Sequence, residues 1–214
     1  MRILALADLH SDYELLDRLA VLPLRKERYD LYLIAGDLTQ HGGTDYVQRL
    51  LNTVSPVLAV PGNNDPDEVV HFLEMAGASV HKKTVHFDRL KITGFGFSPP
   101  TPFDTPGELP EDEIYRQASG LEIDEHTLLL AHAPPYGVLD KIGDTSVGSK
   151  ALAGIVQEKQ PFLYLCGHIH EQVGVEHLGA TTVVNIPPAY EQKAAVISID
   201  ERIPKLKEVE FVQL

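Results

Sequence analysis

The chain has 214 residues, of which 43% are hydrophobic and 23% charged, a balance typical of one globular domain and unlike that of disordered or fibrous proteins. Asp and Glu outnumber Lys and Arg by 31 to 18, giving a net charge of −13, which argues against a protein that coats nucleic acid. No apolar run approaches the ~20 residues of a membrane-spanning helix. With the single Cys166 and no signal-like leader, this predicts one cytoplasmic domain over residues 1–214, without membrane contact.

The first third of the chain alternates between apolar runs and helical patterns. Residues 1–7, 31–35 and 57–60 are short apolar runs, which predict buried strands. A helix is predicted after each strand. We expect Ser11 or Asp12 to cap the first helix and Asp65 the third. This order predicts parallel strands whose carboxyl ends gather functional groups.

From residue 84 the pattern changes to seven candidate strands: 84–87, 90–97, 127–131, 162–166, 173–177, 181–186 and 194–199. Two helices, 111–119 and 149–158, interrupt them. We therefore expect a second sheet that packs on the first. Residues 98–110 hold five of the fifteen prolines and form either a stiff connection or a wall beside the site.

Five polar motifs directly follow predicted strands: Asp8-Leu-His10, Gly36-Asp37, Gly62-Asn63-Asn64-Asp65, His132 and Gly167-His168-Ile169-His170. If these strands are neighbours, the motifs meet at one rim and supply two carboxylates, an amide oxygen and four imidazoles. Seven donors are too many for one tetrahedral ion, so their number predicts two metal ions, which Asp37 could bridge. Oxygen and imidazole ligands without thiolate suit manganese, which we take first, and also iron, nickel, cobalt, zinc or magnesium.

In this order the motifs resemble those of the calcineurin-like metallophosphoesterase superfamily, over nearly the whole chain. Residues 94–103 and 132–137 further resemble its small prokaryotic branch of phosphoesterases. The resemblance implies an α/β fold, a four-layer α/β/β/α sandwich of two mixed β-sheets flanked by helices. It also implies one metal held by Asp8, His10, Asp37 and His170, and another held by Asp37, Asn63, His132 and His168.

The implied activity is phosphodiester hydrolysis by a hydroxide that bridges two metal ions. One position departs from the family pattern: many members carry Gly-Asn-His where this chain has Asn64, and an amide cannot supply a proton. We expect Asn64 to contact the substrate in catalysis, with His41 as a substitute proton donor and Tyr136 as a further substrate contact. The missing acid predicts a preference for aryl phosphodiesters over alkyl monoesters.

Two alternatives use the same fold: a nuclease acting on DNA or RNA ends, and a noncatalytic protein-interaction scaffold. The acidic charge disfavours the nuclease, and the complete set of metal ligands disfavours the scaffold. The expected partner is a small phosphate ester. The sequence does not decide between a monomer and a homo-oligomer. Cys166 is expected to be a small buried hydrophobic residue outside the site. The remaining histidines are expected to be polar residues without a role in the site; they are His71, His81, His86, His126 and His177.

Overall fold

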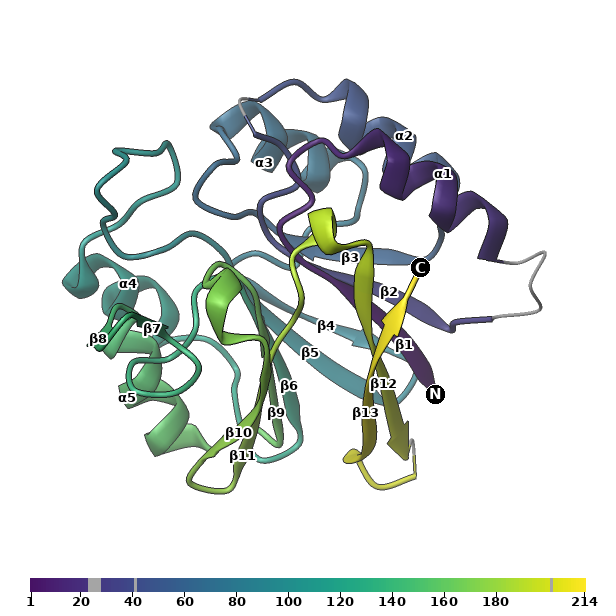
Figure 1. The fold of residues 1–214 in the computed structure, drawn as a ribbon. Helices are drawn as coiled ribbons and strands as arrows, with labels where there is room; N and C mark the ends of the chain where they lie inside the picture. Colours follow the sequence, from purple (N-terminus) through teal and green to yellow (C-terminus); the bar gives the residue numbers. More distant parts are fainter. Residues whose placement is uncertain (23–27, 41, 201) are drawn as a thin grey trace.

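The computed structural model describes residues 1–22, 28–40, 42–200 and 202–214. Two mixed sheets lie face to face, and helices cover their outer sides (Figure 1). This is the α/β/β/α sandwich that the resemblance implies.

The first sheet has the strand order β13, β12, β1, β2, β3. In that order the strands span Lys205–Gln213, Lys193–Asp200, Arg2–Leu6, Leu31–Ala35 and Val57–Val60. β1, β2 and β3 are parallel, as the alternating pattern predicts, whereas β12 and β13 are antiparallel additions. Three helices cover this sheet: α1 (Tyr13–Val21), α2 (Asp45–Thr53) and α3 (Asp67–Met75) (Figure 1).

The second sheet has the strand order β10, β11, β9, β6, β5, β4. In that order the strands span Gly174–Leu178, Thr181–Asn185, Leu163–Cys166, Thr127–Ala131, Leu90–Phe95 and Lys83–Phe87. Its outer side carries α4 (Glu111–Ala118) and α5 (Lys150–Lys159), near the small hairpin of β7 (Lys141–Ile142) and β8 (Thr145–Ser146) (Figure 1). The described residues also include two short 3₁₀ helices, η2 (His170–Gln172) and η3 (Ala189–Glu191).

The core is divided into three layers by the two sheets. Side chains alternate along β1: Leu4 and Leu6 join the cluster under α1 to α3, whereas Ile3 and Ala5 join the cluster between the sheets. A third cluster fills the space between the second sheet and its two helices. Because the central strands are buried on both faces, they read as continuous apolar runs in the sequence.

The helix boundaries follow local capping signals. The Asp12 carboxylate accepts hydrogen bonds from the N–H groups of Glu14 and Leu15, as expected for the cap of α1. Asp65 does not cap α3, because the residue at that cap is Pro66. The prediction for Asp65 is therefore wrong, and its actual contacts are described below.

Other differences lie at exposed or sharply turned backbone. β13 was not predicted because it is an exposed edge strand rich in charged residues, without an apolar run. β5 ends at Phe95 instead of residue 97, where Phe97 has a φ of 71° that an extended strand does not accommodate. Within the described part of the chain, no helix has both the length and the apolar character needed to cross a bilayer.

Candidate metal centre

The five polar motifs meet at one rim, where the parallel strands end. Backbone hydrogen bonds tie the motif loops together: the N–H of Asp8 donates to Gly36 O (3.1 Å), that of His10 to Asp37 O (2.9 Å), and that of Gly167 to His132 O (3.0 Å). The N–H of His168 also donates to the Asp8 carboxylate (3.0 Å), so motifs from both halves of the chain contribute to one site.

Four of the expected donors sit on left-handed backbone. The φ angles are 53° at Asp8, 43° at His10, 51° at Asp37 and 71° at His168. This region is sparsely populated by residues with a Cβ and costs about 1–3 kcal/mol each. Such strained backbone collects at functional sites, where the surrounding structure holds it.

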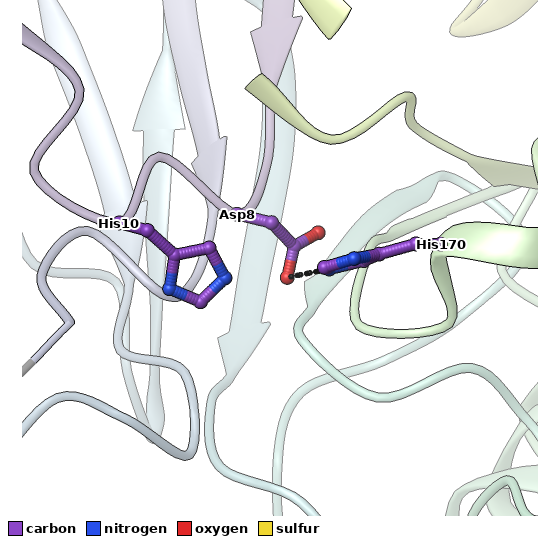
Figure 2. Close-up of side chains that lie close together, drawn as sticks. All are labelled: Asp8, His10 and His170. Carbon is purple, nitrogen blue, oxygen red and sulfur yellow. Dashed lines mark ion pairs between the residues drawn. The ribbon is translucent and has the colours of Figure 1, made fainter. Parts of the chain in front are cut away.

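The first cluster consists of Asp8, His10 and His170 (Figure 2). Their potential ligand atoms all lie within 4.8 Å of one another, and His170 Nε2 is 3.4 Å from Asp8 Oδ1. Asp37 Oδ2 lies 3.7 Å from His10 Nε2, which brings the second carboxylate to this cluster. The buried Nδ1 of His10 has no hydrogen-bond partner within the described structure.

The second cluster surrounds His132, which is completely buried. Its Nε2 lies 3.5 Å from Asp37 Oδ1 and 2.9 Å from Asn63 Oδ1. The His168 ring packs against it with 4.8 Å between centroids. Asp37 thus turns one carboxylate oxygen toward each cluster. Asp8 also lies within 4.8 Å of Asp37 and His132, so it reaches the second cluster as well.

Directed hydrogen bonds set the orientation of the two donors at the centre of this cluster. His132 Nδ1 is 2.8 Å from the Ala35 carbonyl, which can only accept, so Nδ1 carries a proton. Asn63 Nδ2 donates to Thr105 Oγ1, which itself donates to Glu108. When His132 is neutral, the form that binds metals, its Nε2 and Asn63 Oδ1 are two acceptors that face one another.

This arrangement fits a bound cation. Two buried acceptors 2.9 Å apart repel one another unless a positive charge lies beside them. Two ligands at right angles around an ion with bonds of ~2.1 Å are separated by about 3.0 Å. The separations between donors in both clusters, 2.9 to 3.7 Å, are of this size. The residues present can therefore hold divalent metal ions.

The ionisation of the donors is compatible with this role. Burial by itself would raise the pKa of Asp8, but the hydrogen bond to His170, the charges of His132 and His170 and the N–H of His168 together lower it. Burial lowers the pKa of His168 to about 3. His168 is therefore a neutral imidazole near pH 7, the form that binds metals.

Asp65 braces the site instead of capping a helix. Its carboxylate accepts from the N–H groups of Leu38 (3.0 Å), Thr39 (2.8 Å) and Gly62 (2.8 Å), and also from the Thr39 hydroxyl. Burial first, and the charge of Asp37 second, raise its pKa to about 6. Asp65 thereby joins the loop that carries Asp37 to the loop that carries Asn63. The sequence contained no local signal for these contacts.

Asn64 lies beside Asp37. Its backbone N–H donates to Asp37 Oδ1 (2.8 Å) and its side-chain amide to Asp37 Oδ2 (2.6 Å). Asn64 also lines the adjoining cleft. Tyr136 is not among the residues that line this cleft; its ring lies under Lys150 Nζ, 5.2 Å from the centroid. His41 lies outside the described residues.

A cleft of about 490 Å³ opens over the donors. Its floor holds five of them: His10, Asp37, Asn63, His168 and His170. One wall is the Pro-rich segment, with Pro99 to Phe103, and the other is the β7–β8 hairpin with Val147. Of the two expectations for residues 98–110, a stiff connection or a wall beside the site, the structure supports the wall for residues 99–103. The hairpin wall was not predicted, because its strands have two residues each.

A second cavity of about 530 Å³ adjoins the first. Both cavities are lined by Asn63, Asn64 and Phe103. The second is more polar, since Gln40, Asp104 and Thr105 also line it. The two cavities thus meet at Asn63, Asn64 and Phe103.

Comparisons with known proteins agree with this geometry. The family model of calcineurin-like phosphoesterases matches residues 1–172. An uncharacterized protein from Methanocaldococcus jannaschii is 31% identical in an alignment that covers 94% of this chain and 96% of that protein. A "probable cyclic nucleotide phosphodiesterase" from Synechococcus sp. is 30% identical in an alignment that covers 77% of this chain and 66% of that protein.

Solved structures share the fold at low sequence identity. The protein TT1561 of Thermus thermophilus has a TM-score of 0.69 at 19% identity, covering 99% of this chain and 98% of its own. A structure described as a novel archaeal phosphodiesterase has a TM-score of 0.59 at 13% identity and covers both chains completely. At these identities the likeness shows the fold alone.

Proposed function

This chain belongs to the family of calcineurin-like phosphoesterases, and from that premise we propose that it hydrolyses phosphodiesters with two bound divalent metal ions. The carrying observation is the Asp37 carboxylate, which turns Oδ2 toward His10 and Oδ1 toward His132. A carboxylate placed in this way suits a bridge between two ions. Manganese is our first choice, because carboxylate, amide and imidazole donors suit it.

The preference for diesters is supported by the two cavities beside the centre. A diester carries two substituents on phosphorus, and each cavity offers room for one of them. The archaeal phosphodiesterase and the Synechococcus relative carry names of the same reaction class. Two divalent ions held by these residues would supply positive charge for the phosphoryl oxygens and would lower the pKa of water toward neutrality.

The protein's own groups have separate tasks in this mechanism. Ala35 O fixes the ring of His132, so that Nε2 faces the site. Asp37 is held by both hydrogen bonds from Asn64. We propose that the Asn64 amide also donates to a phosphoryl oxygen of the substrate, since it lines the cleft.

Proton supply is the weak step in this arrangement. Asn64 can donate a hydrogen bond but no proton, and general-acid help is worth about 10²–10⁴-fold. We propose His41 as a substitute donor. Aryl phosphodiesters, whose leaving groups need little protonation, should therefore react faster than alkyl monoesters. We also propose Tyr136 as a substrate contact, since its side chain is exposed, with the ring under Lys150 Nζ.

The test is hydrolysis of bis(p-nitrophenyl) phosphate after chelation, with manganese, nickel, cobalt, magnesium or zinc added back. We expect metal-dependent turnover, with kcat/KM reduced more than about 100-fold in Asp37→Ala and His170→Ala. Asp67→Ala and His126→Ala are matched controls at exposed positions and should retain full turnover.

Two results would contradict the proposal. A chain that never binds two ions, measured by metal analysis of the dialysed protein, would favour a noncatalytic scaffold. Faster turnover of an alkyl monoester than of the aryl diester would refute the preference for diesters.

A further inference from the structure

The cleft over the metal centre has largely apolar walls. Pro99, Pro100, Pro102 and Phe103 form one side, and Ile142 and Val147 lie on the hairpin side. Of these, Phe103 is 80% exposed, Ile142 53% and Val147 37%. Exposed apolar side chains from two separate elements thus surround one opening, an arrangement that marks a binding site.

The Phe103 wall is held in place by its own loop. The N–H of Phe103 donates to Thr101 Oγ1 (3.1 Å), and the Thr101 hydroxyl donates to Glu108 Oε1 (2.5 Å). Glu108 also accepts from the N–H of Thr105 (3.0 Å). An exposed aromatic ring on a braced loop is prepared for contact with a ligand, since little entropy remains to be lost on binding.

The charge of the lining limits what the ligand can carry. Among the described residues that line the cleft, none is Lys or Arg. A second phosphate or carboxylate on the ligand would therefore meet no cation away from the metal centre. The Thr101 hydroxyl proton is already used by Glu108, so it offers no donor to a polar group.

We infer that this cleft binds an uncharged apolar substituent of the substrate, an aryl ring or an alkyl chain, between the Phe103 wall and the hairpin side chains Ile142 and Val147. This inference rests on the proposed function, because the phosphoryl group must sit at the metal centre while its apolar substituent extends into the cleft. The more polar second cavity, beyond Phe103, is left for the other substituent.

The test is binding of phosphonates, which carry one substituent and cannot be hydrolysed. Dissociation constants are measured by calorimetry on the manganese-loaded protein for methyl-, phenyl-, hexyl- and 2-carboxyethylphosphonate. We expect phenyl- or hexylphosphonate to bind at least about 10-fold more tightly than methylphosphonate, since apolar burial of this size is worth that factor. The carboxyethyl compound should gain nothing over methyl.

Variants locate the effect. Ile142→Ser and Val147→Ser change residues that line the first cavity and not the second, and they should reduce the ratio of phenyl to methyl affinity. Phe103→Ala should reduce it further, and Phe103→Leu should restore part of it. Ile203→Ser and Phe211→Ala are matched controls at exposed positions, 66% and 40%, and should leave the ratio unchanged.

The outcomes separate the two proposals. Equal affinity for methyl and apolar phosphonates, or tighter binding of the carboxyethyl compound, would overturn the apolar site while leaving the metal centre intact. Binding of no phosphonate together with failure to take up metal would overturn the proposed function itself. Preference for phenyl over hexyl, or the reverse, would support the site and decide between an aryl and an alkyl substituent.

Discussion

At the scale of single residues, the metal centre depends on close approach of two loops. Gly62 shows this best, because a Cβ there would collide with Asp37 Oδ1 and with the Asp37 backbone N. The carboxylate proposed to bridge the metals therefore occupies the space that any other side chain at position 62 would need. Backbone atoms cannot move aside as the end of a flexible side chain can.

Gly62→Ala should consequently lose about 1–3 kcal/mol of the free energy of unfolding through overpacking and weaken manganese binding by displacing Asp37. Urea unfolding and calorimetric metal titration measure the two effects. Gly120→Ala is the matched control, since a Cβ there has no neighbour within 4 Å, and it should change stability by less than about 1 kcal/mol. Equal behaviour of the two variants would show that the loops can separate at no cost.

The donors themselves were predictable from sequence because each one follows an apolar strand. Parallel strands bring their carboxyl ends to one edge, so the structure brings Asp8, Asp37 and His132 together as expected. Asp65 was not predictable, because its four hydrogen bonds reach loops up to 27 residues away. A carboxylate before Pro66 is indistinguishable from a helix cap when only neighbours along the chain are considered.

At the scale of elements, the loop of residues 98–108 connects the cleft wall to Asn63, a proposed metal ligand. Glu108 accepts from Thr101 and from Thr105, and Thr105 accepts from Asn63 Nδ2. One carboxylate thus holds the wall and decides which end of the Asn63 amide faces His132. Glu108 is a positioning residue for Asn63.

Glu108→Gln should weaken manganese binding by about 10–100-fold, the usual effect of altering a residue that orients a metal ligand. A Gln amide can donate to Thr105, so the order of hydrogen bonds can reverse and turn Asn63 Nδ2 toward the site. Metal titration calorimetry measures this, with the exposed Glu125→Gln as control. Affinity equal to that of the unmodified protein would remove Glu108 from this role.

Protonation of Glu108 at low pH should have an effect similar to that of Glu108→Gln. Burial alone would raise the pKa of Glu108, but the hydrogen bonds from Thr101 and Thr105 lower it to about 2. Because the folded pKa lies below the unfolded one of ~4.3, the stabilisation is complete above that pH and is lost as the pH falls toward 2. The Thr105 amide shift in NMR, followed from pH 6 to pH 2, should report the loss at the low end.

The strands and helices with buried faces were predictable, whereas the elements that shape the cleft were not. β1, β2 and β6 are buried along their whole length or nearly so, and their composition shows it. The β7–β8 hairpin and the edge strand β13 lie at the surface, where no apolar pattern is required. The Pro-rich segment was predicted to be an ordered loop. Its position beside the expected metal ligands depends on tertiary packing, which the sequence does not show.

At the scale of the whole molecule, the centre joins the two sheets, so metal binding should stabilise the entire fold. The donors come from loops after β1, β2, β3, β6 and β9, and they bring buried carboxylates together in a chain of net charge −13. Unfolding separates these donors, and therefore a bound cation favours the folded state.

Manganese at 100 times its Kd should add about 2.7 kcal/mol, which for a chain of this length raises Tm by about 5–10 °C. Differential scanning calorimetry with and without a chelator measures the shift. Asp37→Ala should abolish it, whereas Asp67→Ala should keep it. A Tm that is independent of manganese in the unmodified protein would mean that the centre forms without contributing to global stability.

The contact between Asp8 and His168 also dictates when the centre can exist. The Asp8 carboxylate accepts from the N–H of a residue 160 positions later, and β1 pairs with β12, near the other end of the described chain. At a synthesis rate of about 5–20 residues per second, His168 is synthesised roughly 10–30 s after Asp8. The nascent chain thus carries its first ligands long before it can retain an ion, and metal capture becomes one of the last events in its maturation.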